Sequence, residues 1–112
     1  PFAERAFPGL LRSGGRPRHI TSVEWWAHLR PLGSGGGHQL HFDLDEAGLA
    51  AVPEGASPPH PLVSCVLYLS GAEDGAMAPT LVTDQGLSTG STASRAWLCQ
   101  PRPNRLLLFD GG

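Results

Sequence analysis

The chain has 112 residues, of which 40% are hydrophobic and 16% charged, and its formal net charge is −2. That length fits one domain, and the small net charge argues against a disordered, self-repelling chain. All eight basic residues are arginines scattered along the sequence, which predicts no nucleic-acid partner, and the lack of a long apolar run predicts no membrane-spanning segment.

The N-terminal residues 1–21 are predicted to be a loop or linker. Residues 11–19 (LRSGGRPRH) combine glycine, proline and arginine, which is typical of a solvated loop. The two cysteines, Cys65 and Cys99, lie in apolar runs without the spacing of a zinc site. We expect free thiols, which suit a reducing, intracellular compartment, although a single disulfide stays open.

Residues 22–112 read as a series of short strands joined by turns. A helix over 22–30 is the alternative there, but aromatic and β-branched content and the following proline favour a strand. Long loops are expected at 46–61, with room for one helical turn, and at 84–94. The pattern predicts an all-β fold, such as a jelly roll. The expected strands are 22–30 (SVEWWAHLR), 38–45 (HQLHFDLD), 62–70 (LVSCVLYLS), 80–83 (TLVT), 96–100 (AWLCQ) and 105–109 (RLLLF).

The second of these segments carries the most informative chemistry. On a strand, His41 and Asp43 share one face with Cα atoms roughly 6.6 Å apart, so both side chains reach toward one ion. The opposite face, formed by Leu40, Phe42 and Leu44, is expected to pack on a core. An imidazole and a carboxylate, joined by a second histidine, make the facial triad of non-haem iron(II) oxygenases. His-x-Asp alone is a weak motif, and a solvated strand face is its ordinary explanation.

The order of several segments gives that motif a context. It resembles the iron(II)- and 2-oxoglutarate-dependent dioxygenases, especially their prolyl-hydroxylase-like branch. The matching segments are 38–46 (HQLHFDLDE), 64–70 (SCVLYLS), 79–82 (PTLV) and 101–111 (PRPNRLLLFDG).

The resemblance implies a double-stranded β-helix (jelly roll) over 22–112, incomplete at its C-terminal end. It implies that His41 and Asp43 are iron ligands, that Tyr68 hydrogen-bonds the carboxylate of 2-oxoglutarate and that Gln39 lines the pocket. The implied cofactors are Fe(II) and the cosubstrate 2-oxoglutarate. The primary substrate is then a peptide or small molecule oxidised as 2-oxoglutarate is decarboxylated.

The third iron ligand is expected outside the chain. The family's distal histidine would fall just past Gly112 and its cosubstrate-binding arginine further on, so we expect a fragment that is inactive by itself. The other histidines are weaker candidates: His38 is predicted to face away from His41, His28 to lie on a neighbouring strand, and His19 and His60 to lie in loops. Arg105 is expected to be solvated or salt-bridged.

Two other functions stay open at this point. A non-catalytic, cupin-like or jelly-roll binding module would use the same face for a small ligand. A structural β-domain would leave His41 and Asp43 as solvated polar groups.

Overall fold

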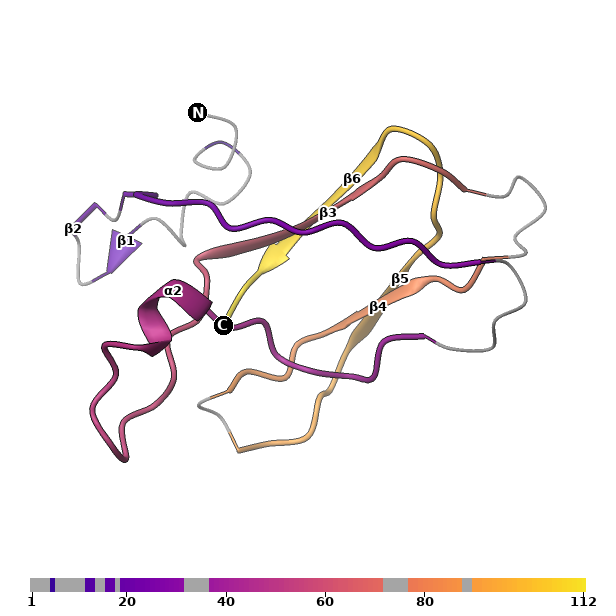
Figure 1. The fold of residues 1–112 in the computed structure, drawn as a ribbon. Coiled ribbons are helices and arrows are strands. Elements are labelled where there is room, and N and C mark those ends of the chain that lie inside the picture. Colours follow the sequence, from indigo (N-terminus) through magenta and orange to yellow (C-terminus); the bar gives the residue numbers. More distant parts are fainter. Residues whose placement is uncertain are drawn as a thin grey trace. The chain divides into compact units, whose positions relative to one another are not determined.

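The computed structural model describes residues 5, 19–31, 37–71, 77–87 and 90–112, together with the backbone of residues 12–13 and 16–17. Strands predominate over helix in these ranges, which confirms the all-β class (Figure 1). No helix among them is long and apolar enough to cross a membrane. The contacts divide the chain into two units, one comprising residues 1–27, 42–64 and 110–112 and the other residues 28–41 and 65–109.

The strands pair in twos. Strand β1 (Arg12–Ser13) pairs antiparallel with β2 (Arg16–Pro17), and β4 (Thr80–Thr83) pairs antiparallel with β5 (Ala96–Cys99). Strand β3 (Val63–Tyr68) pairs with β6 (Arg105–Asp110). The last four strands lie within two residues of their predicted bounds, because each combines an apolar run with turn residues at its ends.

The connection between β5 and β6 shows how the sequence fixes a turn. The Arg105 amide donates to the Arg102 carbonyl at 3.1 Å, which closes a four-residue turn around Pro103 and Asn104. Asn104 has a φ of 61°, and asparagine tolerates this left-handed conformation better than most residues. Its amide donates to the Tyr68 carbonyl at 2.8 Å, so the turn is tied directly to the end of β3.

A carboxylate closes the loop between β4 and β5. Asp84 accepts hydrogen bonds from the Ser94 amide and hydroxyl at 2.8 and 2.7 Å and from the Arg95 amide at 2.9 Å. The Ser94 hydroxyl and the Arg95 amide are the main causes that hold the pKa of Asp84 far below its ordinary value. The Arg95 guanidinium in turn lies 5.5 Å from the ring centre of Trp97.

The predicted strands at 22–30 and 38–45 are wrong. Both segments are extended coil that pairs with no strand of the described residues, and a bend falls at Leu40 (Figure 1). Alternation of polar and apolar residues predicts which faces a strand would present, but a strand exists only where a partner supplies its ladder of hydrogen bonds.

Helix α2 (Glu46–Leu49) is the single turn anticipated in the loop at 46–61. The Asp45 side chain caps it by accepting from the Gly48 amide at 2.8 Å. The Glu24 carboxylate accepts from the next two free amides, those of Ala47 at 2.8 Å and Glu46 at 3.2 Å. Two acidic side chains from separate segments therefore satisfy one helix N-terminus, where negative charge is favoured.

The predicted core faces are largely open among the described residues. Leu40 is 69% exposed and Phe42 40%, so the expected packing behind His41 and Asp43 is absent at these two positions. On β3, alternation places Leu67 on a wholly apolar face with Val63 and Cys65, and Ser64 on the opposite face with Tyr68. Leu67 is nevertheless 56% exposed, whereas Ser64 is buried. None of the large side chains described is fully buried, and the described strands pair only as three two-stranded sheets.

Candidate functional site

His41 is held by the backbone of its own segment. Its Nδ1 lies 2.7 Å from the carbonyl oxygen of Gln39. Because a carbonyl can only accept, Nδ1 carries a proton in this contact. A ligand histidine is commonly oriented in this way, with one ring nitrogen donating to a backbone carbonyl and the other facing the metal.

Gln39 contacts His41 through its main-chain carbonyl oxygen. Its side chain is exposed, and the predicted lining of a pocket by that side chain stays a prediction. The contact with His41 is local, since the two residues are two positions apart.

Asp43 lies in the other unit and is partly buried. Two residues after it comes Asp45, the residue that caps α2. The Asp45 amide also donates to the Pro59 carbonyl at 3.0 Å. The backbone two residues beyond Asp43 is therefore anchored at both its amide and its side chain. Whether His41 and Asp43 bind one ion stays a prediction.

Tyr68 ends β3 and is partly buried. Its hydroxyl donates to the Thr80 Oγ1 at 2.6 Å, joining the end of β3 to the start of β4. Burial is the main cause that raises the pKa of Tyr68, and a hydrogen bond with Cys99 acts in the same direction. The phenol therefore stays neutral at physiological pH, and its proton is engaged in the hydrogen bond to Thr80.

The structure brings together three histidines that the sequence pattern separated. The His38 ring centre lies 4.6 Å from that of His28 and 5.7 Å from that of His41. His38 was expected to face away from His41, and this is wrong because alternation applies only to a strand, whereas the chain bends at Leu40. The signal that could have found the cluster is the glycine-rich run at 33–37, which lies between His28 and His38 in the sequence and ends directly before His38.

Positive charge also acts on this cluster. The pKa of the His38 imidazole is lowered, first by the nearby Arg30 guanidinium, then by burial and by the two neighbouring histidines. His38 is therefore more readily neutral than an isolated imidazole, which leaves a nitrogen lone pair available at physiological pH.

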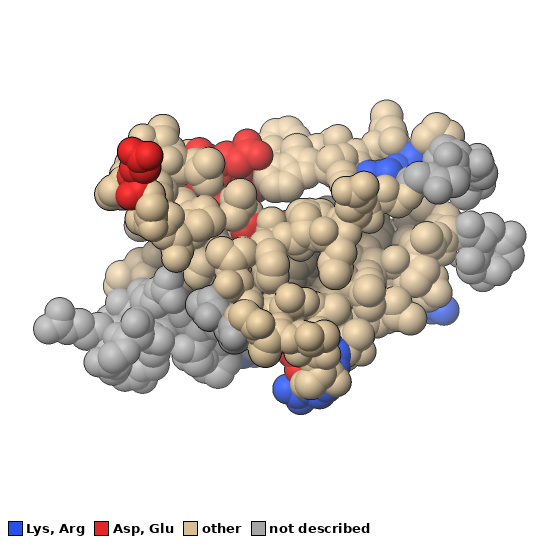
Figure 2. All heavy atoms as spheres, turned by 90° about the horizontal axis from the view of Figure 1, so that it is seen from below, with Lys and Arg blue, Asp and Glu red and all other residues tan. Residues whose placement is uncertain are grey.

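Charged side chains of both signs reach the surface of the described residues. On the face shown in Figure 2, acidic atoms gather together while arginine atoms lie in separate patches.

As their side chains lie, the described residues include no group of three or more His, Cys, Asp or Glu arranged to hold a metal ion. Comparisons with protein-family models, with curated proteins and with solved structures gave no match to this chain. Function therefore has to be argued from the residues themselves.

Proposed function

We propose that this chain is part of an iron(II)- and 2-oxoglutarate-dependent dioxygenase with a double-stranded β-helix fold. The observation that carries the proposal is the ordered series of segments that includes His41-x-Asp43, the Tyr68 strand and the Arg105 strand. The contact of His41 supports it, because a ligand histidine commonly donates one ring N–H to a backbone carbonyl, as His41 Nδ1 can to the Gln39 carbonyl at 2.7 Å.

The residues of this chain would have distinct tasks. His41 and Asp43 would hold the iron with a histidine from beyond Gly112, and positions left open on the metal would accept the cosubstrate. Tyr68 would donate a hydrogen bond to the carboxylate of 2-oxoglutarate. Its single hydroxyl proton is donated to the Thr80 Oγ1 at 2.6 Å in this structure, so binding would exchange that hydrogen bond for one to the carboxylate.

The bound iron and cosubstrate supply the oxidation, in which 2-oxoglutarate and dioxygen yield succinate and carbon dioxide while the substrate is hydroxylated. The chain's part is to bind and orient these groups. A peptide or a small molecule is the proposed substrate class, and the loops at 46–61 and 84–94 are where its contacts are expected.

The decisive experiment measures succinate release from 2-oxoglutarate by the full-length protein containing this chain. We expect release to fall to background in His41→Ala and Asp43→Asn, and to persist in His60→Ala, which changes a histidine in a loop. Unchanged release in His41→Ala would refute the assignment. If the full-length protein fails to bind either iron or cobalt, a non-catalytic jelly-roll binding module becomes the better explanation.

A further inference from the structure

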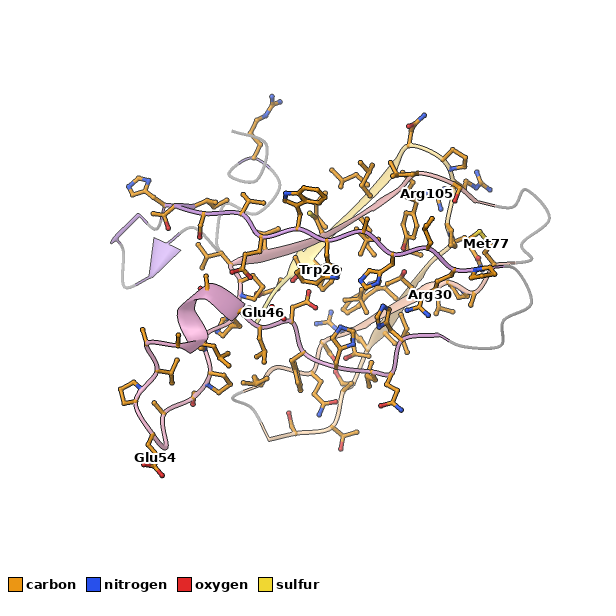
Figure 3. The ribbon with its side chains drawn as sticks, viewed as in Figure 1. Trp26, Arg30, Glu46, Glu54, Met77 and Arg105 are labelled. Atoms are coloured by element: carbon orange, nitrogen blue, oxygen red, sulfur yellow. The ribbon has the colours of Figure 1, made fainter. Side chains whose placement is uncertain are left out.

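The ends of β3 and β5 and the starts of β4 and β6 come together within one unit of the structure. The Tyr68 hydroxyl donates to the Thr80 Oγ1 at 2.6 Å, and Thr80 is the partner of Cys99 in the register of β4 and β5. The Asn104 amide donates to the Tyr68 carbonyl at 2.8 Å, so Arg105, the first residue of β6, lies beside the end of β3 (Figure 3). Hydrogen bonds of both backbone and side chains therefore hold this corner together.

The Arg105 guanidinium has unused hydrogen-bond donors at this corner. The residue is partly buried, and one of its N–H groups donates to the Gln100 carbonyl at 2.7 Å. A guanidinium carries five such donors in a planar fork. No carboxylate of the described residues pairs with Arg105. Its charge nevertheless acts on Tyr68: burial raises the pKa of that phenol, and the Arg105 charge opposes the rise.

Thr80 supplies a second donor beside the same phenol. Its oxygen accepts the proton of Tyr68, so its own hydroxyl hydrogen remains to be donated, and no acceptor for it lies among the described residues. The hydrogen bond received from Tyr68 polarises the Thr80 hydroxyl and makes it a better donor. A cation and a hydroxyl, both next to Tyr68, therefore have no matching anion in the described part of the chain.

We propose that Arg105 and Thr80 bind the carboxylate of a small organic acid. A guanidinium fork suits a carboxylate because two parallel hydrogen bonds can form. One guanidinium supplies one positive charge, which matches a carboxylate better than a phosphate group, whose charge approaches two. Tyr68 keeps its hydrogen bond to Thr80 and orients that donor. The site uses neither His41 nor Asp43, so it does not rest on the proposed function.

The test is a titration of the 112-residue chain with succinate, in the absence of metal ions, followed by NMR. The signals to follow are those of the Arg105 Nε–H group and of Tyr68, the single tyrosine of the chain. We expect saturable shifts of both signals. Affinity should be roughly tenfold weaker in Arg105→Gln and in Thr80→Val, because each removes a hydrogen bond to a charged group. Thr80→Val keeps the branched shape of the side chain and removes the hydroxyl.

Two matched controls separate this site from general effects of charge and of strand β4. Arg102→Gln removes an exposed charge from the turn before β6, and Thr83→Val removes a hydroxyl from the other end of β4. Both variants should bind succinate as the unaltered chain does. Equal weakening in Arg102→Gln and Arg105→Gln would mean attraction by net charge alone and overturns the proposal, as does equal weakening in Thr83→Val and Thr80→Val.

Further arms identify the ligand chemistry and the donor. Inorganic phosphate should bind more weakly than succinate, and tighter binding of phosphate overturns the assignment to a carboxylate. A greater loss of affinity in Tyr68→Phe than in Thr80→Val overturns the role of Thr80, because the tyrosine would then contact the carboxylate itself. In that variant the Arg105 signal reports binding.

The unaltered chain gives a readout that does not depend on how well any variant folds. Of its eight arginines, Arg105 should show the largest succinate-dependent shift of the Nε–H signal. Equal shifts of all eight signals, or none at Arg105, overturn the proposal.

This proposal and the proposed function fail separately. His41→Ala should bind succinate normally in the metal-free chain, whereas the iron proposal expects the same change to abolish succinate release by the full-length protein. Weaker succinate binding in His41→Ala overturns the site at Arg105 and Thr80. Absence of succinate binding by the unaltered chain also overturns that site and leaves the iron ligands untouched.

Discussion

Glu24 is expected to stabilise the segment that follows Asp43. Its carboxylate accepts from the Ala47 and Glu46 amides at 2.8 and 3.2 Å, at a helix end that Asp45 caps through a third amide. Glu24→Ala removes two acceptors at once. Loss of a capping side chain typically costs about 1 kcal/mol, and we expect a loss near this value because water can reach the exposed amides.

The measurement is urea unfolding followed by tryptophan fluorescence, since Trp25 and Trp26 lie next to Glu24 in the chain. A loss of about 1 kcal/mol corresponds to a fall in Tm of roughly 4 °C at this chain length. The stability of Glu24→Gln should lie between that of Glu24→Ala and that of the unaltered chain, because the amide oxygen of glutamine keeps one acceptor. Glu54→Ala is the matched control, since Glu54 lies at the tip of the loop after α2 (Figure 3).

The result that would refute the reasoning is equal stability of Glu24→Ala and Glu54→Ala. Equality would mean that the two amides at the start of α2 are as well satisfied by water as by the carboxylate. A double variant with Asp45→Ala gives a further check, because side chains that cap the same turn should show non-additive losses.

Three further predictions concern the end of β3 and its neighbours. A Cβ at Gly71 would lie 2.7 Å from the Pro101 carbonyl oxygen. Gly71→Ala should therefore lower the free energy of unfolding by about 1–3 kcal/mol in urea titrations. A neutral effect would contradict this close approach of the two backbones. Asn104→Gly should leave stability nearly unchanged, whereas Asn104→Val should lower the free energy of unfolding by about 1–2 kcal/mol because Asn104 has a positive φ. The same urea titrations check both variants. Equal stability of the two variants would be inconsistent with that backbone conformation. Burial raises the pKa of Tyr68, so ultraviolet titration of this single tyrosine should have a higher midpoint in the folded chain than in urea. Because the folded state then holds the proton more tightly, stability should fall as the pH rises from the unfolded pKa through the folded one; identical midpoints would argue against burial of the phenol.

Local signals account for what the sequence predicted well. The bounds of β4 and β5 follow from short apolar runs between turn residues, and the turn before β6 follows from Pro103 and Asn104. The helical turn after Asp45 depends on a capping residue that lies beside it in the chain. Each of these features requires information from only a few neighbouring positions.

Features that depend on distant partners could not be read in the same way. Asp84 is bound by Ser94 and Arg95 across a polar loop, and nothing in the composition of that loop selects those residues. Glu24 reaches a helix whose residues lie more than twenty positions away. The predicted strand at 38–45 was wrong for the converse reason, since its alternation is complete but no described strand pairs with it.

The conformation of the 38–45 segment bears on the proposed iron site. A paired strand would place His41 on the same face as Asp43 and His38 on the other face, whereas here the chain bends at Leu40 and the His38 ring centre lies 5.7 Å from that of His41. We therefore expect a metal that binds His41 and Asp43 together to require pairing of this segment with a neighbouring strand.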